Sequence, residues 1–249
     1  MIVNLDKKLV AQNFDRAACI YDKFSSIQSS CAEFLCHLLF KHLPDLYPAK
    51  ILDIGSGTGA LVKLMLKKFP KSYVVANDIS ALMLQEIEKR FSGSKRLEVL
   101  LGDMDEVYLP SCGLVVSNFA MQWSSNICTL IKKVLSQSDV FAFSTLLDGT
   151  FYQLTSLLGI KGFLSYPTKE EICIYMRKLN VHQIIFEAKE FYLLFENFYA
   201  FLQYVRNLGI GNNNEIGYSE NLLRAAKDMK KEFLVSYNVL FAIVKKGHF

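Results

Sequence analysis

The sequence lacks a long apolar run, a secretory signal and any cysteine pair at metal-ligand spacing. Its longest apolar stretches, GLVVSNFAM and FLVSYNVLFAIV, are interrupted by polar residues and fall short of the roughly 20 residues that cross a bilayer. The first residues mix Asp6, Lys7 and Lys8 with apolar side chains, so they lack the continuous apolar core of a signal peptide. We therefore expect neither membrane insertion nor secretion.

The cysteines and histidines also disfavour several kinds of site. The six cysteines contain no C-x-x-C pair, and the four histidines are scattered along the chain. We expect no metal, no disulfide framework and no catalytic histidine. A reducing cytoplasm is the compartment that such free cysteines favour.

Charge of either sign is not concentrated anywhere in the chain, which has 28 Lys and Arg against 24 Asp and Glu. The basic residues fall in separate pairs, such as 132–133, 177–178 and 230–231, and this pattern is too weak for a nucleic-acid-binding surface. They would suit an acidic protein partner, although ordinary solvated helix faces also explain them. We expect a monomer that binds neither nucleic acid nor membrane.

Short apolar runs alternate with amphipathic stretches between residues 50 and 143, which is the pattern of a parallel sheet with crossover helices. The predicted strands are KILDI, SYVVAND, RLEVLLGD, GLVVSNF and VFAFSTLL. Helices are predicted at 59–69, 81–91 and 125–135, and Ser80 is the expected N-cap of the second.

The alternation changes after residue 149. A helix comes first, followed by a loop with Pro167 and a second helix that Thr168 and Glu171 would cap. Two β-rich runs then complete the same sheet, with two more helices between them. The runs are predicted at 183–195 and 233–245, and the helices near 197–208 and 219–231.

A glycine-rich stretch, ILDIGSGTGA, joins the first predicted strand to the first helix. Gly55, Gly57 and Gly59 leave room there for backbone N–H groups to approach a ligand. Taken alone the loop is ambiguous, because Gly55, Gly57 and Ala60 also match the spacing of a dinucleotide site.

Acidic residues at the ends of three consecutive strands favour a different ligand. Asp53 would repel a pyrophosphate but attract an ammonium and a sulfonium, and S-adenosylmethionine carries both and no phosphate. Asp78 could accept from both ribose hydroxyls, and Asp103 could accept from an adenine amino group that Met104 covers. Any one of these acids could instead cap a helix or bind water. Together they favour a nucleoside-containing cofactor.

These motifs resemble those of the class I S-adenosylmethionine-dependent methyltransferases. The shared features are the D-x-G-x-G-x-G loop at 53–59, the ribose acid Asp78 and the GD pair at 102–103. The resemblance implies an α/β, Rossmann-like sheet of seven mostly parallel strands, whose final antiparallel strand is the run ending FAIVKK. It also implies S-adenosyl-L-methionine as the cofactor, held by Asp53, Gly55, Ser56, Gly57, Gly59, Asp78, Ile79, Gly102, Asp103, Met104 and Asn118.

Further segments resemble the malonyl-[acyl-carrier protein] O-methyltransferases over nearly the whole chain. In order, they are FDRAACIYDKFSSIQ, SNFAMQW, FSTLLDGTFYQL, GFLSYPTKEEI, VRNLGIGNN and YNVLFAIVKK. The resemblance implies methylation of the free carboxylate of malonyl-acyl-carrier protein, at the start of pimeloyl synthesis for biotin. Cys19 and Ile20 depart from the small or polar residues that are more usual in that family.

Methylation of a malonyl carboxylate needs no general base, since this group is already an anion at neutral pH, and it depends largely on positioning. Tyr21 could donate to the carboxylate, and Arg206 could pair with it. Gln122 and Trp123 follow the carboxyl end of the fourth strand, where the methyl group should point. Each candidate has a structural alternative: a solvent-facing hydroxyl, a solvated helix-face arginine, or core packing of the tryptophan.

Other functions stay open at this point. The FDR at 14–16 also resembles the opening of arginine-hydroxylating assembly factors for respiratory complex I, which share the fold. A non-catalytic binding module is disfavoured by the intact set of cofactor residues, and a dehydrogenase by Asp53. Methylation of another small carboxylate is a further alternative.

The opening segment, QNFDRAACIYDKFSSIQ, precedes the first strand but carries three aromatic residues. On one helix, Phe14, Ala18 and Tyr21 would share a face, so we predict a lid packed over the cofactor cleft. We expect one methyltransferase domain over residues 1–249. Its predicted parts are an N-terminal helical lid at 1–45, a cofactor-binding core at 50–148, and helical substrate-cap elements at 150–180 and 197–231.

Overall fold

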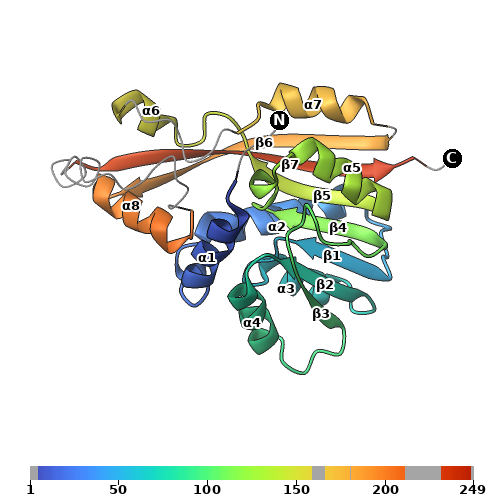
Figure 1. The fold of residues 1–249 in the computed structure, drawn as a ribbon. Coiled ribbons are helices and arrows are strands. Elements are labelled where there is room, and N and C mark those ends of the chain that lie inside the picture. Colours follow the sequence, from blue (N-terminus) through green and yellow to red (C-terminus); the bar gives the residue numbers. More distant parts are fainter. Residues whose placement is uncertain (1–4, 159–165, 180, 211–230, 248–249) are drawn as a thin grey trace.

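A twisted sheet of seven strands forms the centre of the computed structural model, which describes residues 5–158, 166–179, 181–210 and 231–247 (Figure 1). The strands lie in the order β3-β2-β1-β4-β5-β7-β6. Their bounds are β1 Lys50–Ile54, β2 Tyr73–Asp78, β3 Leu97–Leu101, β4 Cys112–Asn118, β5 Ser138–Leu146, β6 Val181–Phe195 and β7 Phe233–Lys246. The predicted Rossmann-like fold is confirmed.

Strand direction also agrees with the prediction. The first five strands pair in parallel, whereas β7 runs antiparallel to both β5 and β6. Most of β7 is buried, as a strand between two neighbours should be, while alternate residues of β6 are exposed along much of its length. In Figure 1 the long β6–β7 pair extends beyond the rest of the sheet toward α8.

Helices connect the strands and cover the sheet. Within the described residues they are α1 Lys7–Ala17, α2 Ser26–His42, α3 Ala60–Lys68, α4 Ala81–Arg90, α5 Ile127–Gln137, α6 Tyr152–Leu158, α7 Lys169–Arg177 and α8 Phe198–Asn207, with single 3-10 turns at Tyr21–Lys23 and Met121–Trp123. None of the helices in this part of the chain is both long and apolar enough to cross a membrane. The helix predicted at 219–231 lies outside the described residues, except for its last position.

Side-chain caps fix where several helices begin. The hydroxyl of Ser80 accepts from the amide of Met83 at α4, and Thr168 forms a reciprocal capping box with Glu171 at α7, as predicted. The prediction that a helix starts at residue 125 is wrong by two positions. The side chain of Asn126 accepts from the two amides that follow Ile127, so α5 starts at Ile127.

The N-terminal segment also differs from its prediction. A single helical face through Tyr21 is wrong, because α1 ends at Ala17 and Tyr21 begins a separate 3-10 turn. The amides of Ala18 and Ile20 bond to carbonyls three residues back, which closes the α-helical pattern. The longer α2 packs against α3, β4 and β5, and its first turn lies with α1 and the 3-10 turn at the carboxyl ends of the strands.

The position of α1 brings distant parts of the chain together. In Figure 1 it lies between α4 and the end of α8. Ala17 and Ala18 pack on Met83 of α4, and the carboxylate of Asp15 accepts from the hydroxyl of Ser80 at 2.6 Å. At the other side, a Cβ built on Gly209 would lie only 3.0 Å from the carbonyl oxygen of Asn13. Both contacts hold α1 across the edge where the parallel strands end.

Candidate active site

A cavity lies at the carboxyl ends of β1 to β4. The cofactor core, α1 and the C-terminal half of the chain all contribute to its lining. Most of the predicted site residues line it, namely Tyr21, Gly55, Gly57, Asp78, Ile79, Gly102, Asp103, Met104, Asn118, Gln122 and Trp123. Residues that sequence patterns assigned to separate segments therefore meet around one space.

Four predicted site residues lie elsewhere. Asp53 and Ser56 line a smaller adjoining hollow, which shares Tyr21 and part of the glycine loop with the cavity. Gly59 has a positive φ of 90° just before α3, where a Cβ would approach Ile87 and Phe91 within about 3 Å. Arg206 is exposed on α8 and does not line the cavity.

Asp53 is buried without a hydrogen-bond partner for either carboxylate oxygen. The side chain is 1% exposed, and burial raises its pKa to about 8. The hydroxyl of neighbouring Ser56 bonds to the backbone carbonyl of Asp53 rather than to the carboxylate. The amide oxygen of Asn77, which also lines the cavity, is another buried acceptor without a partner. Both suit a ligand that brings its own N–H or O–H donors.

Asp78 joins the glycine loop to the start of α4. Its two carboxylate oxygens accept from the amides of Gly57 at 2.8 Å and Ser80 at 2.9 Å. Burial raises the pKa of Asp78 to about 6, even though these two bonds oppose the rise. The bonds fix the carboxylate at the cavity wall.

The two glycines of the loop after β1 that line the cavity leave different amounts of space. A Cβ on Gly55 would lie 2.2 Å from the Cβ of Ala120, so the turn closes tightly against the loop after β4. A Cβ on Gly57 would have no atom within 4 Å, because its missing side chain faces open space. This gap, together with the unpaired acceptors, fits the polar groups of S-adenosylmethionine.

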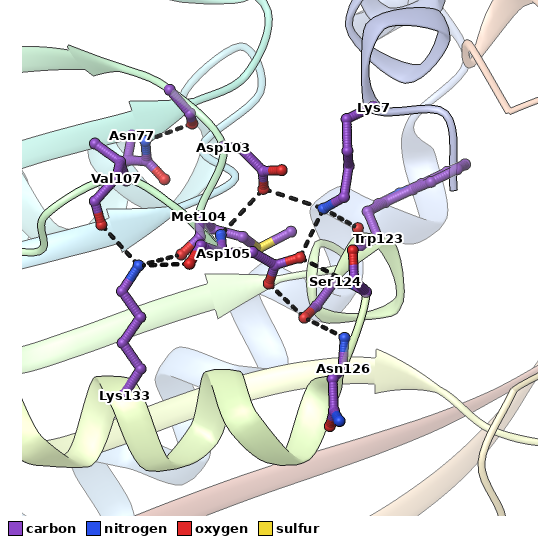
Figure 2. Close-up of polar contacts among 12 residues, drawn as sticks. Lys7, Asn77, Asp103, Met104, Asp105, Val107, Trp123, Ser124, Asn126 and Lys133 are labelled. Carbon is purple, nitrogen blue, oxygen red and sulfur yellow. Dashed lines mark hydrogen bonds and ion pairs between the residues drawn. The ribbon is translucent and has the colours of Figure 1, made fainter. Parts of the chain in front are cut away.

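Lys7 connects α1 to the loop after β3, a contact that the sequence did not predict (Figure 2). Its ammonium lies 3.0 Å from Asp103 Oδ1, 2.8 Å from Asp105 Oδ2 and 2.8 Å from the carbonyl oxygen of Trp123. Burial would raise the pKa of Asp105, but bonds from Lys7 and Ser124 outweigh it and hold the pKa below its usual range. The ion pairs therefore position Asp103 from the side of α1.

A second lysine fixes the other side of the same loop. The ammonium of Lys133, on α5, donates to the backbone carbonyls of Met104, Asp105 and Val107, as Figure 2 shows. Three backbone acceptors on one ammonium leave the loop little freedom. Met104 is thereby held against the cavity, where it is 8% exposed.

We expect Lys7→Met to destabilise the fold by about 1–3 kcal/mol, since it leaves Asp103 and Asp105 as unpaired like charges. Hydrogen exchange of the α1 amides should accelerate, and urea unfolding would give the stability change. Lys8→Met is the matched control, because Lys8 is exposed on the same helix. Equal exchange rates in the two variants would contradict the role given to Lys7.

The motif FDR at 14–16 has structural roles. Phe14 packs edge-on against Trp123 with ring centroids 5.4 Å apart, and Asp15 bonds to the start of α4. Arg16 donates to the carbonyl of Gln12 and to the side chain of Asn13. Trp123 thus lines the cavity and also packs against Phe14, so the site position and the packing role considered for it from the sequence are both present.

The loop after β4 presents several amides and rings to the cavity. The amide nitrogen of Gln122 donates to the carbonyl of Phe119 at 2.7 Å, which fixes its direction. Phe119 itself adopts a left-handed conformation with φ 55°, and its backbone amide is held by the Ser144 hydroxyl. Such strain in a non-glycine residue costs on the order of 1–3 kcal/mol and is typical of functional loops.

Comparison with known proteins gives the family. Residues 51–137 match the model of a methyltransferase domain. Across 99% of both chains, the sequence is 34% identical to the malonyl-[acyl-carrier protein] O-methyltransferase of Neorickettsia risticii (strain Illinois). The chain belongs to this family. A second member, from Chlorobium phaeovibrioides (strain DSM 265 / 1930), is 31% identical and matches 96% of this chain and 90% of its own.

This malonyl-[acyl-carrier protein] O-methyltransferase family member is therefore an S-adenosylmethionine-dependent methyltransferase, which confirms the predicted enzyme class and cofactor. Among solved structures, the magnesium protoporphyrin IX methyltransferase of Synechocystis PCC 6803, determined with S-adenosylhomocysteine, superposes with a TM-score of 0.58. It is 10% identical, and the match covers 91% of this chain and 88% of that one. At that identity the likeness shows the fold alone.

Cofactor binding in this methyltransferase should depend on pH through Asp53. The pKa of Asp53 rises from 3.8 in the unfolded chain to about 8 in the folded protein. Between these two pH values the carboxyl group is protonated in the folded protein but ionised in the unfolded chain. Stability should therefore fall as the pH rises, by on the order of 2–4 kcal/mol between about pH 5 and pH 8. Affinity for the cationic cofactor should rise over the same range, because it prefers the ionised carboxylate.

Urea unfolding and calorimetry at several pH values would test both trends, with Asp53→Asn as the comparison. The variant has no carboxylate to titrate, so its stability should depend less on pH than that of the wild type. Parallel curves for the two proteins would show that Asp53 does not carry the effect.

Proposed function

We propose that this protein transfers a methyl group from S-adenosylmethionine to the free carboxylate of malonyl-acyl-carrier protein, an early step of pimeloyl synthesis for biotin. The observation that carries the proposal is the similarity over 99% of both chains to a relative bearing that name. The match includes the segments outside the cofactor core, which contribute residues such as Tyr166, Ile210 and Tyr237 to the cavity. Free thiols at all six cysteines agree with a reducing cytoplasm.

The proposed roles of the cofactor residues follow from their positions. Asp78 would accept from the ribose hydroxyls, and Asp103 with Met104 would hold the adenine. Asp53 and the amides of the loop at 55–57 would face the methionine end, where the ammonium can pair with the buried carboxylate. When bound, S-adenosylmethionine supplies an electrophilic methyl group on a sulfonium.

No general base is required by this reaction. A carboxylic acid with an ordinary pKa near 4 is ionised at neutral pH and already carries the nucleophilic oxygen. The described residues that line the cavity include neither histidine nor cysteine, which suits catalysis by positioning. Tyr21, Gln122 and Trp123 would orient the acceptor beside the methyl group.

Tyr21→Phe should lower kcat by about tenfold or more while changing the affinity for S-adenosylmethionine by less than about threefold. Tyr21 lines the cavity beside Asp78, and burial raises the pKa of its phenol well above the ordinary value, so the hydroxyl stays a donor. Tyr73→Phe, at the opposite end of β2 from Asp78, is the control. Equal losses of kcat and cofactor affinity would make Tyr21 a structural residue only.

The acceptor can be tested with a set of loaded carrier proteins. Malonyl-, succinyl- and acetyl-carrier would each be incubated with the enzyme and S-adenosylmethionine, and methyl transfer followed by release of S-adenosylhomocysteine. We expect turnover with the malonyl carrier, slower turnover with the succinyl carrier and none with the acetyl carrier. Absence of turnover with the malonyl carrier would overturn the proposal, and preference for free small acids would favour another carboxylate acceptor.

A further inference from the structure

Buried tyrosines gather at the part of the cavity built by the C-terminal half of the chain. Tyr166 and Tyr237 both line the cavity, and Tyr237 donates a hydrogen bond to the hydroxyl of Tyr204 at 3.2 Å. They come from separate elements: Tyr166 precedes α7, Tyr204 lies on α8 and Tyr237 on β7. None belongs to the glycine loop or to the acidic strand ends.

The hydroxyl of Tyr166 has no partner among the described residues. The residue is 8% exposed, and its hydroxyl makes no hydrogen bond with any residue that the structure describes. Because Tyr166 lines the cavity, this hydroxyl can donate to a ligand there.

The described lining offers a carboxylate no free cation. Lys7 is its one basic side chain, and that ammonium is already shared between two aspartates and a backbone carbonyl. Arg206 is exposed outside the cavity. An anionic acceptor in this space would meet neutral donors from the phenols.

The chemistry of the tyrosines suits that task. Burial raises the pKa of Tyr204 to about 12 and also raises the pKa of Tyr166, while burial and the neighbouring Tyr204 and Tyr166 raise that of Tyr237. All three phenols therefore stay protonated. Because a hydroxyl proton rotates to suit its partners, Tyr204 can donate to Tyr237 while Tyr237 donates to a carboxylate in the cavity. Neutral donors would also leave the attacking oxygen more electron-rich than a guanidinium would, and they would not repel the positive sulfonium.

We propose that Tyr166 and the hydrogen-bonded pair Tyr237–Tyr204 form the acceptor-carboxylate site of this enzyme, a positioning site that binds the carboxylate through neutral phenol donors. The inference rests on the proposed function, since it needs an acceptor with a free carboxylate. It also accounts for the absence of an arginine from the described lining of the cavity.

Kinetics of Tyr166→Phe and Tyr237→Phe would test the site. Each variant should raise the KM for the malonyl carrier on the order of 10- to 100-fold, the effect of losing a hydrogen bond to a charged group. Affinity for S-adenosylmethionine, measured by calorimetry, should stay within about twofold, which also reports correct folding. The matched control is Tyr175→Phe, because the Tyr175 hydroxyl donates to the carbonyl of Cys128 away from the cavity.

An acetyl carrier used as a competitive inhibitor separates a carboxylate site from general packing, because it has the same arm but no carboxylate. Its inhibition constant should be the same for wild type, Tyr166→Phe and Tyr237→Phe. If the variants weakened binding of the malonyl and acetyl carriers to the same degree, the proposed site would be overturned. It would also be overturned if their KM for the malonyl carrier equalled that of Tyr175→Phe while the wild type methylates this carrier. A wild-type enzyme without activity on the malonyl carrier would overturn the proposed function first, and this inference with it.

Discussion

Gly55→Ala is expected to abolish cofactor binding and to lower the free energy of unfolding by about 2–5 kcal/mol. The backbone at Gly55 has φ +66°, and a Cβ there would meet the Cβ of Ala120 at 2.2 Å. That contact is far inside van der Waals range, so the turn after β1 or the loop after β4 must move. Both line the cavity, and calorimetry with S-adenosylmethionine together with urea unfolding would measure the two effects.

Gly93→Ala is the control for this prediction. Gly93 also has a positive φ, +86°, but it is exposed and a Cβ there would have no atom within 4 Å. The control should therefore show only the cost of the left-handed conformation, about 1–2 kcal/mol, with normal cofactor affinity. If Gly55→Ala and Gly93→Ala had similar cofactor affinity and stability, the contact with Ala120 would not be the cause of the expected loss.

Asp78→Ala is expected to weaken S-adenosylmethionine binding by on the order of 100-fold or more. The variant removes the proposed acceptor for two ribose hydroxyls, and each hydrogen bond to a charged group contributes about 1.5–3 kcal/mol. It also leaves the amides of Gly57 and Ser80 without their acceptor, so the glycine loop and the start of α4 lose their connection. Calorimetry would give the affinity, and thermal unfolding would show a parallel loss of stability.

Asp139→Ala controls for the removal of a carboxylate in general. Asp139 is exposed near the start of β5, on the opposite edge of the sheet from the cavity. The Asp139→Ala variant should therefore bind S-adenosylmethionine with the affinity of the wild type. Retention of full affinity in Asp78→Ala would exclude the proposed ribose contact.

The cofactor core could be predicted from sequence because its determinants are local. A strand, a glycine turn and a helix follow one another between 50 and 69, and parallel strands necessarily bring Asp53, Asp78 and Asp103 to one edge. Helix starts were predicted to within two residues at Ser80 and Thr168, where a capping side chain lies next to the helix.

Contacts between distant segments could not be predicted in this way. Lys7 and Asp105 are 98 positions apart, and nothing in either local sequence indicates that they pair. The buried tyrosines likewise come from three elements that only the folded chain brings together. For Arg206 a local signal did exist: the apolar spacing of Phe198, Phe201 and Val205 defines the buried face of α8, and Arg206 lies off it.

The prediction for the N-terminal segment was wrong because a contact-dependent helix end was not visible in the periodicity. Helical periodicity placed Tyr21 on the same face as Phe14, but three-residue hydrogen bonds after Ala17 end the helix first. Tyr21 still reaches the cavity, because the 3-10 turn that it begins lies beside the glycine loop. The lid function of α1 stays a prediction, for which Lys7→Met is the test.

The most direct test of the proposed methyl transfer is to find which atom of the acceptor receives the methyl group. Malonyl-carrier protein would be incubated with the enzyme and S-adenosylmethionine, and the intact carrier and its released pantetheine arm then analysed by mass spectrometry. The proposed chemistry predicts one added methyl group, located on the terminal carboxylate of the malonyl unit as an ester. An unmodified carrier, or a methyl group on carbon or on the protein itself, would contradict it.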